Sequence, residues 1–138
     1  MNTSLRQVKR GDWDFILELR NEFFNYFYRQ EKVIEKEDHY AYMTKQSSNP
    51  KFHHWIIEYE SNTVGYVRIL ENDVGIMIKK EFQNKGIASD ALKLVEQKAQ
   101  KLGISKLIAL VKVENEGSKK IFLNNNYKLK MYWLEKNF

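Results

Sequence analysis

The segment from Gln83 to Ala88 holds residue types that suit a phosphate group. It reads Gln-Asn-Lys-Gly-Ile-Ala and separates a stretch with strand alternation from a stretch with helical spacing. The first amides of a helix lack acceptors within the helix and lie at the positive end of its dipole. Gly86 allows close approach to the backbone, and Lys85 adds a positive charge. These residues predict a pyrophosphate site, although an ordinary strand-to-helix loop with one glycine fits them equally well.

Other phosphate and metal chemistry is not supported. The sequence contains neither Gly-x-Gly-x-x-Gly nor Gly-x-x-x-x-Gly-Lys-Ser/Thr, which excludes the two most common phosphate-binding loops. Cysteine is absent, so no thiolate is available as a nucleophile or ligand. His53 and His54 are adjacent and therefore point to opposite faces of a strand. We expect no metal site.

The elements that position the loop follow from the apolar pattern. The sequence predicts strands at 4–9, 52–59, 64–70, 74–79, 107–111 and 127–134, and helices at 12–28, 36–47, 86–102 and 116–125. The continuous apolar run at 107–111 is typical of a strand buried on both faces. A strand, a helix and a buried strand in succession predict a parallel crossover. We therefore expect an α/β fold, in which an antiparallel meander precedes one parallel βαβ crossover, within a single domain over 1–138.

Two segments together resemble the GNAT superfamily of N-acetyltransferases. Gln83–Ala88 is similar to the Q/R-x-x-G-x-G/A motif of that family, and Ile78 to Phe82 resembles the segment that precedes it. The family has a second signature downstream of this motif. The residues of this sequence that resemble it are Asn115-Glu116-Gly117-Ser118, Phe122 and Asn126-Tyr127. The resemblance covers about 55–134 well and the front helices loosely. It implies a mixed sheet with splayed central strands and acetyl-CoA as co-substrate.

The resemblance also implies where acetyl-CoA lies. The backbone near Met77 and Ile78 would pair with the pantetheine amides. The pyrophosphate would lie on the amides of Gln83, Asn84, Lys85, Gly86, Ile87 and Ala88. Asn115 would contact the pantetheine arm, with help from Ser118, and the same asparagine suits a helix N-cap. A neutral amine would attack the thioester directly, and a backbone N–H would stabilise the oxyanion.

Two departures from the family pattern affect the chemistry. Phe122 stands where the family often has a tyrosine acid, and phenylalanine cannot donate a proton. The thiolate then leaves unassisted, since a thiol has a pKa near 8.5, or another group such as Tyr127 protonates it. Asn126 replaces a glycine but tolerates the left-handed conformation. The catalytic residues stay unknown, because Glu71 and Asp73, the nearest carboxylates, lie at a predicted turn.

The front helices would form the acceptor side. Arg20, Asn21 and His39 resemble the branch that acetylates nucleotide-linked amino sugars, including enzymes of pseudaminic acid synthesis, which makes them the predicted substrate-binding residues. An arginine on an apolar helix face suits a phosphate or carboxylate, but it also suits a snorkelling side chain over the core. His39 is a candidate base, although a partly buried structural histidine is the more common case.

Three functions stay open at this point. The first is acetylation of an amino sugar, such as a nucleotide-linked one, and the second is acetylation of a protein N-terminus such as that of a ribosomal protein. The third is a non-catalytic acetyl-CoA-binding module, which Phe122 supports. The net charge of +5 comes from scattered residues, which does not favour nucleic acid as a partner. A homodimer is compatible with the sequence.

The expected cellular location follows from the short length of the apolar stretches. The N-terminus has no apolar region of a signal peptide, and no stretch approaches the roughly 20 apolar residues of a membrane span. We expect a cytoplasmic protein without a membrane partner.

Overall fold

An antiparallel sheet in the order β1-β2-β3-β4 lies at the centre of the protein. The computed structural model describes residues 2–26 and 30–138. The strands are β1 (Thr3–Gln7), β2 (Phe52–Tyr59), β3 (Asn62–Leu70) and β4 (Asp73–Ile78). Each strand pairs with the next in an antiparallel register. The predicted meander over 52–79 is therefore confirmed, and the pattern placed the bounds of β2 correctly.

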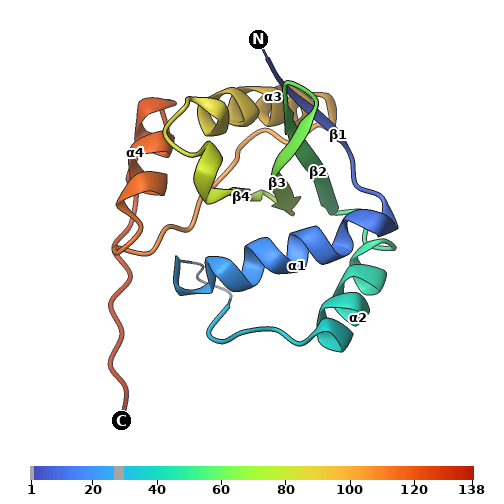
Figure 1. Ribbon diagram of the computed structural model, residues 1–138. Coiled ribbons are helices and arrows are strands. Elements are labelled where there is room, and N and C mark those ends of the chain that lie inside the picture. The colour runs from blue at the N-terminus through green and yellow to red at the C-terminus, as the bar shows by residue number, and fades with distance from the viewer. Residues whose placement is uncertain (1, 27–29) are drawn as a thin grey trace.

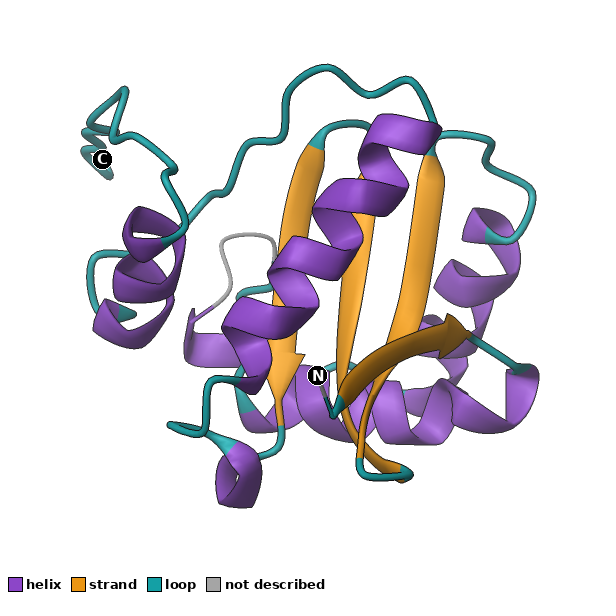
Figure 2. Cartoon of the chain, turned by 90° about the horizontal axis from the view of Figure 1, so that it is seen from above, coloured by secondary structure: helices purple, strands orange, loops and turns teal. Residues whose placement is uncertain are grey.

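Helices cover both faces of this sheet. They are α1 (Trp13–Glu22), α2 (Lys36–Gln46), α3 (Ile87–Lys101) and α4 (Glu116–Asn124), with 3-10 turns η1 (Arg10–Asp12), η2 (Phe24–Tyr26) and η3 (Lys80–Phe82). Figures 1 and 2 show α3 across one face and α1 with α2 on the other. Within the described ranges, no helix has the length and apolar character needed to cross a membrane.

The alternation of each strand divides the core into two clusters. Ile56, Tyr66 and Met77 pack with residues of α1 and α2. Ile57 and Val67, which follow directly in β2 and β3, pack instead with α3 and with Phe122 of α4. Neighbouring strand residues therefore serve opposite layers, because successive side chains leave a strand on opposite faces.

The first helix is shorter than its apolar pattern predicted. We expected a helix over 12–28, but α1 ends at Glu22 and a 3-10 turn follows at Phe24–Tyr26. The end of the predicted helix, at residues 27 and 28, lies outside the described residues. Aromatic residues continue past Glu22, so the apolar periodicity outlasts the helix itself. The helices predicted at 36–47, 86–102 and 116–125 are confirmed to within a residue or two.

The predicted central strand at 107–111 is wrong. Only Ile108 meets β4, through one parallel bridge to Asp73. Its N–H donates to Asn72 at 2.8 Å, and the N–H of Val74 donates to the Ile108 carbonyl at 2.9 Å. The parallel crossover is thus reduced to a single bridge, after which the segment runs away from β4. Its apolar residues pack against the α3 core on one side only, and an apolar run alone cannot show whether strands lie on both sides.

The predicted last strand at 127–134 is also absent. Residues from Lys128 onward form an extended, exposed segment without strand assignment. Figure 1 shows this segment leaving the body of the molecule beyond α4. Alternation shows that a segment can form a strand, but pairing also requires a neighbouring strand, and none lies beside this segment in the described chain.

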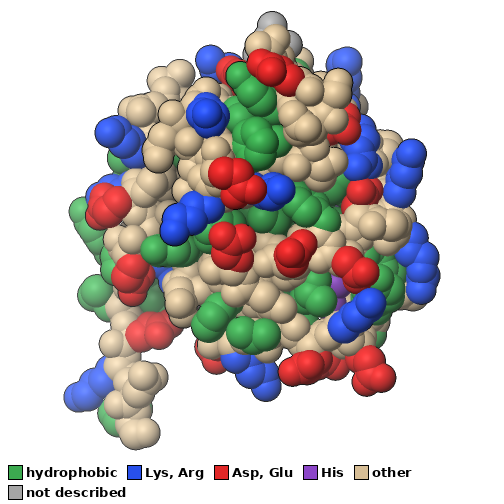
Figure 3. Space-filling view, in the orientation of Figure 1, with side chains coloured by type: hydrophobic (Ala, Val, Ile, Leu, Met, Phe, Trp, Pro, Cys, Tyr) green, Lys and Arg blue, Asp and Glu red, His purple; other side chains and the backbone are tan. Residues whose placement is uncertain are grey.

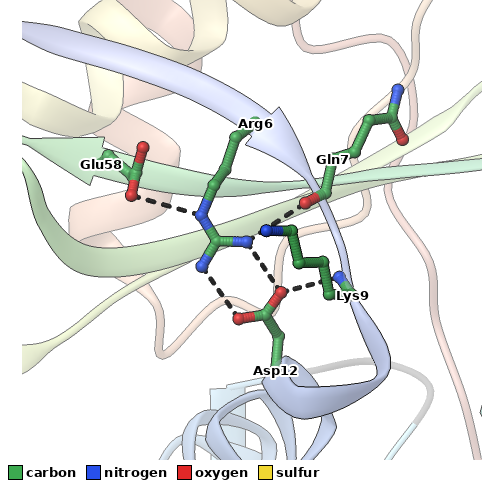
Figure 4. A network of polar contacts seen from close by, with 5 residues as sticks. All are labelled: Arg6, Gln7, Lys9, Asp12 and Glu58. Atoms are coloured by element: carbon green, nitrogen blue, oxygen red, sulfur yellow. Dashed lines mark hydrogen bonds and ion pairs between the residues drawn. The ribbon is translucent and has the colours of Figure 1, made fainter.

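An ion-pair network joins β1 to the start of α1 (Figure 4). Arg6 donates to both carboxylate oxygens of Asp12, at 2.8 and 2.9 Å, and to Glu58 on β2 at 3.2 Å. Asp12 also accepts the N–H of Lys9 at 2.7 Å. Asp12 is the N-cap residue of α1, but its carboxylate makes no cap bond to that helix and closes the preceding turn η1. Hydrogen bonding from Arg6 lowers the pKa of Asp12, and the network fixes where α1 crosses the sheet.

Candidate active site

The outer edge of β4 is the first part of the site. The N–H of Val74 points away from β3 because it bonds to Ile108, whereas the N–H of Lys79 bonds to Val64 of β3. Backbone direction alternates along a strand. Ile76 and Ile78 therefore direct their backbone groups to the open edge, while Met77 directs its own to β3. The Ile78 carbonyl accepts the side-chain amide of Gln83 at 3.0 Å.

This alternation refines the prediction for the pantetheine arm. The sequence singled out Met77 and Ile78, and Ile78 does lie with its N–H at the open edge. Ile76 takes the place of Met77 as the second residue with an outward amide. The sequence shows that residues two apart in a strand direct their amides to the same edge. It does not show which edge of the strand is open.

The loop before α3 forms the second part of the site. Asn84 and Gly86 have left-handed φ angles of 61° and 79°. No side chain caps α3, and the backbone N–H groups of residues 84–89 have no acceptor among the described residues. A Cβ on Gly86 would meet no atom within 4 Å. The result is a run of unpaired amides with open space at Gly86 and with Lys85 exposed beside it, and this fits a pyrophosphate.

Asn115 is confirmed as the N-cap of α4. Its Oδ1 accepts the N–H of Ser118 at 3.2 Å, while its Nδ2 makes no hydrogen bond within the described chain. Asn125, at the other end of α4, donates to Ser89 in the first turn of α3 at 3.1 Å. The two sequence signatures therefore lie on neighbouring helices. The contact of Asn115 with a ligand stays a prediction.

The end of α4 and the turn after it contain both residues that depart from the family pattern. Asn126 has a φ of 70°, so asparagine does adopt the left-handed conformation here. Phe122 is buried in the α3 core and meets Tyr127 edge-on, with ring centroids 5.0 Å apart. Burial, followed by the charge of Glu96 on α3, raises the pKa of Tyr127. The hydroxyl considered as a replacement acid therefore holds its proton tightly.

Arg20 and His39 lie together on the α1–α2 face. Nη1 of Arg20 is 3.1 Å from Nδ1 of His39, and Nε2 of His39 is 2.8 Å from the Trp13 carbonyl oxygen. A carbonyl only accepts, so Nε2 carries the proton and Nδ1 accepts from the arginine. Burial lowers the pKa of His39, which keeps it neutral. Both ring nitrogens are engaged, so the geometry gives His39 a structural role rather than that of a base.

Asn21 holds the loop before α2. Its Oδ1 accepts the N–H of Ile34 at 2.8 Å and Nε2 of Gln30 at 3.2 Å, and its Nδ2 donates to the Ile34 carbonyl at 3.0 Å. These bonds occupy the polar groups that a substrate contact would need. The geometry therefore favours a role in loop structure for Asn21.

Arg68 of β3 is the residue that sequence reasoning missed. It lies over Gly75 of β4, where an added Cβ would come within 3.0 Å of its Cζ atom. Its Nη1 donates to the Asp73 carbonyl oxygen at 2.8 Å and lies 3.7 Å from the Asp73 carboxylate. Burial, with a contribution from the charge of Arg68, lowers the pKa of Arg20. Arg68 of β3 pairs directly with Gly75 of β4. A glycine opposite an arginine leaves room for the long side chain, but the sequence shows this only once the pairing of the two strands is known.

The remaining titratable candidates lie elsewhere or are engaged. Asp73 is buried beside Arg68, whereas Glu71 is exposed in a turn with a φ of 59°. Nδ1 of His54 lies 2.9 Å from the Tyr66 hydroxyl, and burial lowers the pKa of His54 to about 4. Among the residues that the structure describes, no three His, Cys, Asp or Glu side chains form a metal-binding group.

Comparison with known proteins agrees with this geometry. A family model described as "Acetyltransferase (GNAT) domain" matches residues 2–128. A spermidine N-acetyltransferase from Vibrio cholerae, solved in complex with CoA and spermine, is 23% identical with a TM-score of 0.85, covering 99% of this chain and 87% of that one. No curated protein matches the sequence.

Two further solved structures share the fold. A domain from Methanocaldococcus jannaschii DSM 2661 is 25% identical with a TM-score of 0.80, covering 91% of this chain and 88% of that one. An N-acetyltransferase from Staphylococcus aureus Mu50 is 20% identical with a TM-score of 0.74, covering 93% and 84%. The expected mixed α/β fold class is confirmed.

Proposed function

The chain belongs to the GNAT acetyltransferase family, and we propose that its acceptor is an amine on a molecule that also carries a phosphate or carboxylate. The protein is an N-acetyltransferase, and acetyl-CoA is the acetyl donor of this family. Nucleotide-linked amino sugars are the acceptor class that combines both groups and fits the resemblance of the front helices.

The charge of the acceptor face carries this proposal. Arg20 is half-buried, and its described contacts are the neutral His39 and the ring of Tyr42, whose centroid lies 4.9 Å from Cζ. No carboxylate pairs with Arg20 in the described part of the chain. Arg68 lies near Arg20, but the Asp73 carboxylate, 3.7 Å from its Nη1, balances its charge. A half-buried guanidinium without a counter-ion favours an anionic ligand.

The same observation decides against a polycationic acceptor. The Vibrio cholerae neighbour acts on spermidine, which makes polyamines the main competing class, but identity at that level supports the fold alone. The charge of Arg20 would repel a polyamine, and no carboxylate pairs with Arg20 in the described residues to offset that repulsion. Polyamine acetylation is therefore the alternative that an assay must test directly.

For the donor, the free backbone groups define the proposed binding residues. The amides of residues 84–89 would hold the pyrophosphate, and the outward N–H groups of Ile76 and Ile78 would pair with the pantetheine arm. Nδ2 of Asn115 is free to donate to the same arm. An amide at the β4 edge, such as that of Ile76, would also stabilise the oxyanion formed when the amine attacks the thioester. We assign no general base.

An acetylation assay that follows thiol release tests the proposal. The acceptors are a nucleotide-linked amino sugar, an amino sugar phosphate, the uncharged amino sugar, spermidine and an N-terminal peptide. We expect the two anionic acceptors to react fastest, and Arg20→Gln to raise their KM without changing that of the uncharged sugar. Lys45→Gln, which removes an exposed charge from α2, is the control. Fastest turnover of spermidine or the peptide would refute the acceptor class, and acetyl-CoA binding without turnover of any amine would favour a non-catalytic module.

A further inference from the structure

The guanidinium of Arg68 lies against the backbone of β4, at the residue before an outward amide. A Cβ built on Gly75 would come 3.0 Å from Cζ and 3.1 Å from Nη2 of Arg68. Arg68 and Gly75 are direct partners in the register of β3 and β4, so the side chain crosses from one strand to the other. The next residue, Ile76, directs its N–H to the open edge of β4. The guanidinium and this N–H therefore lie beside the same stretch of backbone.

Arg68 reaches that backbone on the acceptor side of the sheet. Tyr66 of β3 and Met77 of β4 pack in the cluster that includes residues of α1 and α2. Residues two apart in a strand share a face, so Arg68 and Gly75 lie on this face as well. It is the face covered by the helices that carry Arg20 and its neighbours. An amine that approaches β4 from these helices meets the guanidinium beside the backbone.

Asp73 holds the guanidinium by one nitrogen and leaves another available. Nη1 of Arg68 donates to the Asp73 carbonyl oxygen at 2.8 Å and lies 3.7 Å from the Asp73 carboxylate. Nη2 makes no hydrogen bond or ion pair within the described residues. The donors of a guanidinium lie in one rigid plane, so a contact through Nη1 also fixes the direction of Nη2. The Arg68 side chain is 21% exposed, which leaves part of it open to a ligand.

The surface around the sheet supplies no broad positive field. Basic and acidic side chains are interspersed over the face of the molecule that Figure 3 shows, and Asp73 balances the resting charge of Arg68. Negative charge that develops during a reaction is then best stabilised by donors that contact it directly. The N–H of Ile76 is one such donor, and Nη2 of Arg68 is a second beside the same stretch of β4.

We propose that Arg68 is a catalytic residue, which donates from Nη2 to the oxyanion of acetyl transfer together with the N–H of Ile76. The inference rests on the proposed function, which places the thioester at the edge of β4. When the amine nitrogen bonds to the carbonyl carbon, the C–O π electrons move to oxygen, where the two donors stabilise them. Collapse then breaks the C–S bond, and the thiolate leaves with its electron pair. The nitrogen releases its proton, which reaches the thiolate through solvent, whereas the guanidinium keeps all its protons.

Two substitutions remove the free donor in different ways. Arg68→Lys keeps a positive charge beside Asp73, but a single nitrogen cannot hold Asp73 and reach the oxyanion together. Gly75→Ala keeps every functional group and adds a Cβ that displaces the guanidinium from β4. The controls are Lys93→Gln, at an exposed position of α3, and Gly11→Ala, where a Cβ meets no atom within 4 Å. Circular dichroism checks that each variant folds.

Steady-state kinetics and calorimetry of acetyl-CoA binding separate catalysis from structure. The acceptor used is the compound that reacts fastest with the wild type in the thiol-release assay. We expect Arg68→Lys to lower kcat about a hundredfold and Gly75→Ala about tenfold. The Kd of acetyl-CoA and the KM of the acceptor should change by less than about twofold, because the contact forms only in the transition state. Since both substitutions act through one guanidinium, the double variant should lose no more than Arg68→Lys alone.

Several outcomes would overturn the inference. They are an unchanged kcat in either single variant, multiplied losses in the double variant, a loss explained by weaker acetyl-CoA binding, and no turnover of any acceptor. Gly86→Glu separates this failure from that of the donor site. If Gly86→Glu abolishes acetyl-CoA binding while Arg68→Lys keeps its kcat, only the role of Arg68 is wrong. Fastest turnover of spermidine would refute the acceptor class, and the same variants would then test Arg68 with spermidine.

Discussion

Arg20 donates from Nη1 to Nδ1 of His39 at 3.1 Å, and His39 is itself held through Nε2 by the Trp13 carbonyl at 2.8 Å. The histidine acts as a fixed acceptor that aims the guanidinium. We predict that His39→Leu raises the KM for an anionic acceptor about tenfold, the equivalent of ~1.4 kcal/mol. His39→Gln, which keeps a donor and an acceptor, should recover part of the loss. Steady-state kinetics with each substrate varied measures both, and an unchanged acceptor KM in His39→Leu would contradict the positioning role.

The proposed phosphate loop depends on Gly86 for two separable reasons. Its φ of 79° disfavours any side chain by about 1–2 kcal/mol, and a carboxylate placed beside the free amides would occupy them and repel the pyrophosphate. We predict that Gly86→Glu abolishes acetyl-CoA binding by calorimetry, whereas Gly86→Ala retains weakened binding. Gly11→Glu is the control, because it too has open space but lies far from the loop in sequence and has no positive φ. Unchanged affinity in Gly86→Glu would refute the placement of the pyrophosphate.

The two roles of Asn115 can be separated by serine. Asn115→Ala should lower the free energy of unfolding by about 1 kcal/mol through loss of the cap of α4. Asn115→Ser retains a cap and should keep most of that stability, but it loses the free Nδ2 group. We therefore expect Asn115→Ser to weaken acetyl-CoA binding while leaving stability nearly unchanged. Equal affinity of the serine variant and the wild type would leave Asn115 with the cap role alone.

The hydroxyl of Tyr127 should not contribute to proton transfer. Because burial and the charge of Glu96 raise its pKa, it is a poor acid. We predict that Tyr127→Phe leaves kcat and its dependence on pH unchanged. A loss of tenfold or more in kcat, with binding of acetyl-CoA retained, would instead identify this hydroxyl as the acid that replaces the usual tyrosine.

The Arg6–Asp12 pair gives stability a defined dependence on pH. The pKa of Asp12 is lowered in the folded state, first by hydrogen bonding from Arg6. Its contribution is therefore present above the unfolded pKa, about 3.9, and is lost as pH falls through the lower folded value. Asp12→Asn should cost about 1–2 kcal/mol near neutral pH, and the difference from wild type should shrink in acid. Urea unfolding near neutral pH and in acid measures the free energy of unfolding of both proteins.

The exposed Asp38 provides the comparison for that experiment. It forms no ion pair within the described residues, so Asp38→Asn should change stability little at either pH. A pH-independent difference between Asp12→Asn and wild type would show that the carboxylate charge does not stabilise the fold.

The sequence by itself determined the features that depend on local pattern. Alternation placed β2, and helical periodicity placed α3, because each pattern reports one element and the face that it buries. The loop at Gln83–Ala88 and the cap at Asn115 were also readable, since a strand end, a glycine and a helix start lie within a few residues of one another. These features need no knowledge of distant contacts.

Only the tertiary structure decided what depends on neighbours. Residues 107–111 and 127–134 have the patterns of strands, but pairing needs a second backbone alongside, and only Ile108 finds one. The outward amide of Ile76 became identifiable once β3 was known to lie on the other edge of β4. The pairing of Arg20 with His39 joins two helices, and Arg68 over Gly75 depends on strand register. A sequence specifies what each residue can do, whereas its partner is set by the packing of elements far apart in the chain.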